Sequence, residues 1–260
     1  MHKKAFKWYP TCIIHSKMST INRKAVTIRC DSKFSLFKLP IYKATNKVLL
    51  PTESKRILVD DNIYRQIQKS DMQFGYITDF SKDPALVTIV DHVVESYSKI
   101  GTIAKVDTVE RTHNHMHALT VHGTQRFTVL NLENVERNVQ ISLSSFFTDV
   151  NMVDQENTKK EYDLYNLLVH IKEIYGSEYD IDAYLPLEVE EFKPNIDTIE
   201  SIKDIENSEH EKHRREMFSF AVSNMVGDLG VPEKLALLHS QDSNVRLDWL
   251  LKSIIKPFST

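Results

Sequence analysis

The chain changes its hydrophobic period near residue 157, and this change constrains the fold more than any other feature of the sequence. Before it, short segments rich in Val, Ile, Thr and aromatic residues alternate with turn residues, which is typical of β-strands. After it, apolar residues recur every three or four positions, which predicts amphipathic helices. Strands first and helices second predict an α+β fold, in which a curled sheet or partly open barrel precedes a helical half.

Individual elements can be placed on this outline. Short strands are predicted at 36–41, 47–51 and 55–59, a helix follows Asp60 or Asp61 as its N-cap, and further strands fill the chain to about residue 154. In the second part, helices are predicted before Gly176, between 215 and 230, from 231, and from 243. In the last of these, the apolar stripe that we expect to face the core consists of Val245, Trp249, Leu250 and Ile254 or Ile255.

We therefore divide the chain into a basic tail (1–35), a β-barrel subdomain (36–156) and a helical subdomain (157–260). Residues 178–216 contain 13 acidic and five basic residues and no steady apolar period. Such a composition favours an exposed acidic connection, at about 178–213, or a loosely docked helix.

Charge is distributed unevenly between these parts. Residues 1–35 hold eight Lys or Arg and one acidic residue, so the remainder carries 25 basic against 35 acidic residues. A basic start with Ser and Thr and no long apolar stretch is typical of an organelle transit segment, and a disordered basic tail is the alternative. A transit segment implies that the protein is located in a plastid, apicoplast or mitochondrion, whereas a disordered tail implies the cytoplasm. The acidic body argues against a nucleic-acid partner bound by charge.

Several classes of protein are excluded by composition. Both cysteines, Cys12 and Cys30, lie in the basic tail, so the body offers no disulfide, thiolate zinc site or cysteine nucleophile. The six glycines show no phosphate-loop or G-x-G spacing, so no nucleotide cofactor is expected. No apolar run reaches the length of roughly 18 residues that a membrane span needs, so no membrane partner is expected either.

One motif contains candidate metal ligands. The stretch RTHNHMHALTVHG places His113, His115 and His117 at alternate positions, which share one face of a strand, and imidazole is a common metal ligand. A zinc site would also need a further ligand and a carboxylate behind the histidines, and the sequence identifies neither. The alternative, an exposed polar hairpin, is favoured, so no metal is predicted and the three histidines are only candidates.

Other motifs resemble the N-terminal, substrate-binding domain of Lon proteases, in family order from about residue 36 to 255. The segment LPIYKATNKVLLP resembles the opening of that domain, and IGTIAKV resembles its G-T-x-A segment. The segment VHGTQRFTV resembles its motif V-x-G-x-x-R-F-x-V. The C-terminal helices contain a Leu-Leu pair followed by Arg-Leu, as in the family. The match to single-domain, plastid-type Lon-like proteins is closer still. That closer match rests on Pro51, Glu53, Ser54, Lys55 and Tyr64. The residues to which the family resemblance gives structural roles are Leu39, Pro40, Tyr64, Gly101, Gly123, Arg126, Phe127, Arg246 and Leu247.

Arg126 and Phe127 admit two interpretations. They could belong to a ligand surface, or Phe127 could lie in the barrel core while Arg126 pairs with a carboxylate. The second is favoured because aromatic side chains on strands mostly pack inward. Gly123, just before this strand, is expected at a turn or bulge.

The resemblance implies a PUA-like β-barrel and a polypeptide-binding function without catalysis. The 260 residues contain no Walker lysine and no Ser-Lys peptidase motif; Ser54 and Lys55 are adjacent, so in a strand they would point to opposite faces. The expected partners are unfolded or specific client proteins and a separate protease, for which the chain would be an adaptor. Candidate peptide-binding residues are Leu49, Leu50, Pro51, Tyr76 and Phe80, for each of which a place in the core is the alternative.

Two other functions are open at this point. PUA-like folds include RNA-binding modules, although the body is acidic and has no aromatic and basic cluster. A metal-dependent enzyme built on the histidines is the third hypothesis.

Overall fold

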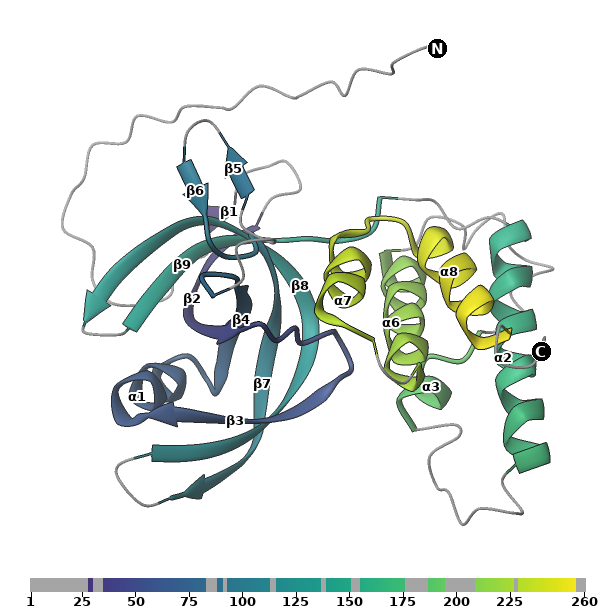
Figure 1. The fold of residues 1–260 in the computed structure, drawn as a ribbon, viewed down its shortest axis with the longest axis horizontal. Coiled ribbons are helices and arrows are strands. Elements are labelled where there is room, and N and C mark those ends of the chain that lie inside the picture. Colours follow the sequence, from purple (N-terminus) through teal and green to yellow (C-terminus); the bar gives the residue numbers. More distant parts are fainter. Residues whose placement is uncertain are drawn as a thin grey trace.

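The structure is a computed structural model of the 260-residue chain. It describes residues 28–29, 35–82, 88–90, 93–112, 116–136, 139–150, 155–175, 187–194, 209–226 and 229–255. A β-barrel lies on one side and a group of helices on the other (Figure 1), which confirms the predicted α+β architecture.

Five strands close the barrel into a ring. They are β2 (Ser35–Thr45), β4 (Gln73–Asp79), β7 (Ile100–Arg111), β8 (Met116–Glu136) and β9 (Val139–Phe146). Each pairs with the next, and β9 returns to pair with β2; only the β2–β4 pair is parallel. The ring closes because β2 pairs with β9 through its first half and with β4 through its second, with Ile41 opposite both Gln140 and Gly75.

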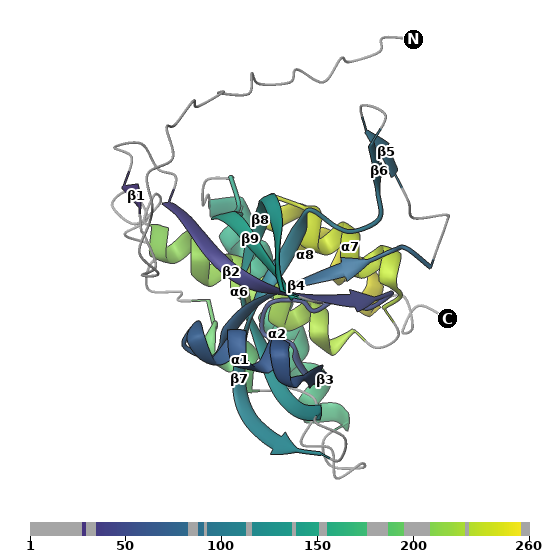
Figure 2. The ribbon, with the colours of Figure 1, turned by 90° about the vertical axis from the view of Figure 1, so that its left-hand side faces the viewer.

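Shorter elements complete the β part. β1 (Ile28–Arg29) pairs with the start of β2, and β3 (Ser54–Asp60) pairs with the first part of β8. β5 (Thr88–Val90) and β6 (Val93–Glu95) form a separate two-stranded ribbon. The helix α1 (Asp61–Lys69) begins at the N-cap Asp60, whose side chain accepts a hydrogen bond from the Ile63 backbone N–H at 2.9 Å. It packs beside β2, β3 and β4 (Figure 2), where Ile67 joins the barrel core.

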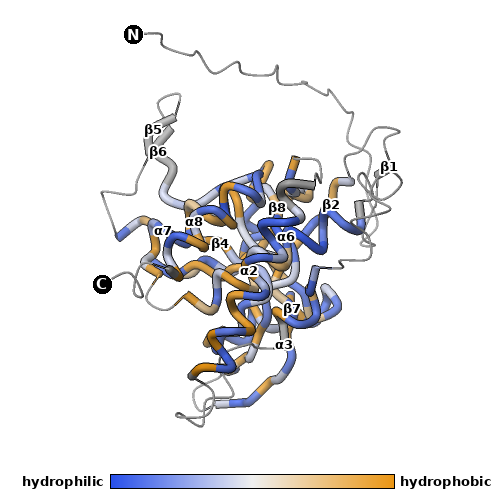
Figure 3. The backbone as a smooth tube through the Cα atoms, turned by 90° about the vertical axis from the view of Figure 1, so that its right-hand side faces the viewer, coloured by the Kyte–Doolittle hydropathy of each residue, from blue (hydrophilic) through white to orange (hydrophobic). Residues whose placement is uncertain are grey.

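The helical half consists of α2 (Gln155–Tyr175), α3 (Leu187–Glu191), α6 (Glu209–Met225), α7 (Val231–His239) and α8 (Ser243–Ile255). Blue and orange stretches alternate along these helices in Figure 3, as expected for amphipathic helices. Helices α2, α3, α6 and α8 share one core that contains Leu168, Phe218 and Leu250. No helix in the described ranges is long and apolar enough to cross a membrane.

Two segments differ from the sequence prediction. Residues 47–51 are a loop rather than a strand, because their apolar side chains are divided between two cores. Val48 and Leu50 pack against α6 and α7, whereas Leu49 packs inside the barrel. In the acidic segment, residues 187–191 are helical and α6 begins at Glu209, before the predicted boundary; Arg214 and Arg215 pair there with the buried Glu161 of α2.

Candidate functional site

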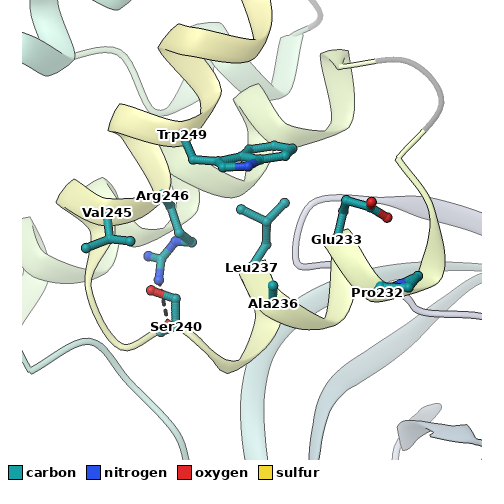
Figure 4. Close-up of a pocket in the computed structure, with 8 residues that line it drawn as sticks. All are labelled: Pro232, Glu233, Ala236, Leu237, Ser240, Val245, Arg246 and Trp249. Carbon is teal, nitrogen blue, oxygen red and sulfur yellow. Dashed lines mark hydrogen bonds between the residues drawn. The ribbon is translucent and has the colours of Figure 1, made fainter. Parts of the chain in front are cut away.

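An apolar hollow lies between α7 and α8 (Figure 4), and we call it the α7–α8 groove. Its volume is about 330 Å³. Five of the eight lining side chains are apolar, and Figure 4 draws the Trp249 ring beside Leu237, with Glu233 at one end and Arg246 near the other. The lining residues are Pro232, Glu233, Ala236, Leu237, Ser240, Val245, Arg246 and Trp249.

Local sequence fixes both helices that form the groove. Gly230 is the N-cap of α7, and Pro232 follows in the first turn, where its missing N–H costs no helical hydrogen bond. At the start of α8, the Asp242 carboxylate accepts a hydrogen bond from the Asn244 backbone N–H at 2.8 Å. Arg246 donates to the Ser240 carbonyl oxygen at 2.8 Å, so the turn between the helices is tied to α8 itself.

The groove exposes apolar surface that the sequence assigned to the core. Val245 is 58% exposed, whereas the next two residues, Arg246 and Leu247, are almost completely buried. Of the predicted stripe, Leu250 is buried and Trp249 and Ile254 pack against the helical core, so only Val245 departs from the prediction, and Arg246 takes a buried position beside it. Val150 is 67% exposed and donates its backbone N–H to Gln241, in the turn between α7 and α8, so a second exposed aliphatic residue lies next to this turn.

Arg246 is buried because it belongs to a charged cluster that joins the two halves of the molecule. We call Arg126, Asp149, Glu216 and Arg246 the junction cluster. Arg126 donates to Glu216 at 2.7 Å and to Asp149 at 2.6 Å, and Arg246 binds both oxygens of Asp149 at 2.9 and 2.5 Å. The two guanidiniums also donate to the Ser240 carbonyl oxygen, and both lie over the Phe220 ring.

Two positive and two negative side chains balance within this cluster. Burial alone would raise the pKa of the Asp149 carboxyl, but Arg246 and then Arg126 outweigh burial and hold that pKa below its ordinary value. The guanidiniums are shielded from solvent and their acceptors are all protein groups. Arg126 thus pairs with carboxylates and Phe127 lies in the barrel core, so neither offers a surface to a ligand in this conformation.

The five peptide-binding candidates also lie inside the molecule. Leu49 and Leu50 are at most 1% exposed, and Pro51 is buried beside them. Tyr76 packs against the Tyr42 ring in the barrel core, where burial raises the pKa of its hydroxyl, and Phe80 is 7% exposed. Apolar side chains suit a surface groove or a core equally well, but each of these is buried, so none is accessible to a bound peptide here.

The histidine motif is only partly visible. His113 and His115 lie outside the described residues. His117 donates or accepts a hydrogen bond with Asp61 at 2.7 Å through Nε2, and its ring stacks on Tyr64 with centroids 4.1 Å apart. Among the described residues, no three His, Cys, Asp or Glu side chains lie close enough to hold a metal ion. His117 and Tyr64 thus connect β8 to α1.

The remaining motif residues fill positions where chains approach closely. A Cβ on Gly123 would lie 2.3 Å from the Leu50 carbonyl oxygen, and one on Gly101 would lie 2.5 Å from that of Tyr76. Gly123 also exchanges two backbone hydrogen bonds with Thr52 and Glu53, beside a bulge in β8. Leu39 and Pro40 are buried just before β2 changes partner, and Leu247 lies in the helical core.

The groove residues Pro232, Ala236 and Val245 were not among the binding candidates selected from the sequence, which assigned Val245 to the core. Their pattern is that of ordinary amphipathic helices, so no sequence signal separates them from core positions. The one usable sign was Arg246, a charged residue within the predicted apolar face of α8 and next to the exposed Val245.

Comparisons with known proteins agree with this architecture. The family model of the ATP-dependent protease La (LON) substrate-binding domain matches residues 38–256. The N-terminal domain of the Mycobacterium avium complex Lon protease superposes with a TM-score of 0.50 at 16% identity, covering 83% of this chain and 97% of that one. A Lon N-terminal domain protein from Xanthomonas campestris gives a TM-score of 0.45 at 15% identity, covering 82% and 96%.

No curated protein matches the sequence significantly. The Mycobacterium avium complex domain shares the fold at low identity, while the family model spans most of the chain. On this match, the chain belongs to the Lon substrate-binding domain family.

Proposed function

We propose that this protein binds polypeptide substrates without catalysis, and that the α7–α8 groove receives an apolar side chain of the bound polypeptide. The observation that carries the proposal is the exposed apolar lining of this groove, with Val245 more than half exposed beside Trp249 and Leu237. Membership of the substrate-binding domain family supports it.

The groove suits a single side chain better than a folded partner. A volume of about 330 Å³ lies at the lower end of ordinary ligand pockets, which start near 300 Å³. Complete burial of one Leu or Phe side chain contributes roughly 1.5–3 kcal/mol, so one groove gives weak binding that other contacts must supplement. Weak contact with one apolar side chain is appropriate for unfolded clients, which differ in sequence and share exposed apolar residues.

The test is fluorescence anisotropy of a labelled, permanently unfolded polypeptide titrated with the full chain, at low and at moderate salt. We expect saturable binding in the micromolar range that tolerates salt, because apolar contacts are not screened. The double variant Ala236→Gln/Val245→Ser places a polar amide in the groove and removes its exposed aliphatic side chain, and should weaken binding about tenfold.

A matched control is Ile174→Ser, which removes an equally exposed aliphatic residue from α2, outside the groove. This variant should bind the polypeptide like the wild type. Equal weakening by both variants would contradict a specific groove. Binding to a structured RNA alone, lost as salt rises, would instead favour the RNA-binding hypothesis.

We also propose that the protein acts as an adaptor that presents clients to a separate protease. The support is the family itself, whose model describes the substrate-binding domain of an ATP-dependent protease. Degradation of the labelled polypeptide in an ATP-supplied organelle extract should accelerate when the protein is added. The groove double variant should not accelerate it.

An organelle is the proposed location, and its support is the basic composition of residues 1–35. A fluorescent reporter fused behind residues 1–35 should enter a plastid or mitochondrion. The same fusion with its lysines and arginines replaced by glutamine should remain in the cytoplasm.

A further inference from the structure

A second hollow, of about 430 Å³, lies between the barrel and the helical half, and we call it the barrel–helix cleft. One wall comes from β3, β7 and β8, including Ser54, Asp107 and Thr124, and the other from α3 and α6, including Glu191 and Phe192. Unlike the α7–α8 groove, it is lined largely by polar side chains.

The charges on the two walls have the same sign. Asp107 lies on the barrel wall and Glu191 on the helical wall. No lysine or arginine is among the described residues that line the cleft, and its two histidines are His122, which contacts Asp107, and His213. Asp107 is the extra residue of a β-bulge between Val106 and Thr108, and bulges commonly redirect a side chain. Its Oδ1 contacts His122 Nδ1 at 2.6 Å, which leaves Oδ2 as an acceptor.

Glu191 lacks an obvious structural role. It is the last residue of α3, where the exposed helix carbonyls make a negative charge unfavourable. Within the described part of the chain it has no hydrogen bond or ion pair, whereas its neighbour Glu190 faces Lys172 at 3.8 Å. A carboxylate that contributes little to stability in this position is available for a ligand.

The hydroxyl groups of the cleft are acceptors as well. The Thr124 hydroxyl donates its proton to the Ile103 carbonyl oxygen at 3.0 Å, so its lone pairs remain to accept a hydrogen bond. Ser54 adds a second hydroxyl and Phe192 an aromatic ring. A guanidinium carries five N–H donors and no acceptor, and its plane stacks on aromatic rings, so its chemistry is the complement of this lining.

We propose that the barrel–helix cleft binds the cationic side chain of a bound polypeptide, with arginine preferred. The inference rests on the proposed polypeptide-binding function and specifies its substrate class: clients that carry a basic residue as well as an apolar one. Arginine is preferred to lysine because its planar fork can bind carboxylates on both walls while it lies against Phe192.

The experiment uses the full chain and two short synthetic peptides of apolar residues around one central position. That position is arginine in the first peptide and citrulline, its uncharged isostere, in the second. The wild type should bind the arginine peptide about tenfold more tightly, since hydrogen bonds to a charged group are roughly twice as strong as neutral ones. Free argininamide should compete with the arginine peptide and leave the citrulline peptide bound.

The variants Glu191→Gln and Asp107→Asn should remove most of the preference for arginine. The matched control is Glu190→Gln, on the same helix but outside the cleft, and it should keep the preference. Equal affinity for the two peptides, or a preference that both cleft variants retain, would overturn the cleft proposal while the polypeptide-binding function stands. Failure of the wild type to bind either peptide would overturn both.

Discussion

Helices α7 and α8 present two different surfaces to their surroundings. On the barrel side, Arg246 and the Ser240 carbonyl oxygen take part in the junction cluster, where each charge has a protein partner. On the outer side, the same two helices leave apolar side chains in an open groove. The charges of the junction cluster are all paired, whereas the apolar side chains of the groove are only partly buried. We infer that the junction cluster holds the two helices in place and so preserves the shape of the groove. The predictions below test this division.

The largest effect is expected at the centre of the junction cluster. Asp149→Ala removes the carboxylate that both guanidiniums share and leaves Arg246 without a carboxylate partner, while Arg126 keeps Glu216. An uncompensated buried charge costs about 3–5 kcal/mol. Urea unfolding should show a loss of this size. The control Asp248→Asn alters a half-exposed residue 3.8 Å from Lys160 and should cost less than about 1 kcal/mol. Similar losses in both variants would mean that Asp149 contributes no more to stability than a surface ion pair does.

Added volume should be tolerated in the groove and not where β8 approaches the loop at Leu50. Gly123→Ala would place a Cβ 2.3 Å from the Leu50 carbonyl oxygen, and such overpacking costs about 1–3 kcal/mol. Ala236→Leu adds a larger group to the open groove and should change the free energy of unfolding by less than about 0.5 kcal/mol. Urea midpoints of the two variants make the comparison directly. A stable Gly123→Ala variant would show that the loop at Leu50 can move aside.

Acid should weaken the junction before it affects the groove. Because the pKa of Asp149 is lowered in the folded state, its stabilising contribution is fully present above the unfolded pKa of about 4 and is lost as pH falls through the folded value. The difference in unfolding free energy between the wild type and Asp149→Asn should be constant above about pH 5 and shrink below about pH 4. Urea midpoints over a pH series measure it. A difference that shrinks near neutral pH would assign the effect to another group.

The smallest effect on stability is expected from the groove rim. Val245→Ser exchanges a side chain that is already 58% exposed, so the free energy of unfolding should change by less than about 0.5 kcal/mol. The same variant should lower the affinity for an unfolded polypeptide measurably. A large loss of stability would show that Val245 supports the core and that the groove is not a free surface.

The fold was largely predictable because it depends on local period. The strands at β3, β4 and β7, the N-cap at Asp60 and the C-terminal helices follow from alternation, capping and helical spacing. Residues 47–51 were not predictable in this way, since a run that divides its side chains between two cores has the pattern of a strand. That division becomes visible only when α6 and α7 are in place.

The junction cluster and the barrel–helix cleft were less predictable, because both depend on pairs of residues that are distant in sequence. The partners of Arg126 lie at Asp149 and Glu216, and no spacing rule connects them. The barrel–helix cleft joins Asp107 to Glu191 across the same division. The sequence does show Arg246 within the apolar stripe of the last helix. A charged residue on such a face indicates a buried ion pair.

Ring closure has a consequence for the chain during its synthesis. β2 can pair with β9 only after Gln140, which lies opposite Ile41, has been synthesised. The contact of Arg126 and Arg246 with the same Ser240 carbonyl oxygen forms only when the end of the chain is present. At the usual rate of 5–20 residues per second, roughly 100 residues separate these strands by about 5–20 s on the ribosome. One edge of β2 stays open to other chains during that interval. A protein proposed to bind unfolded polypeptides thus emerges as one of them, and nascent chains released early should depend on chaperones for solubility.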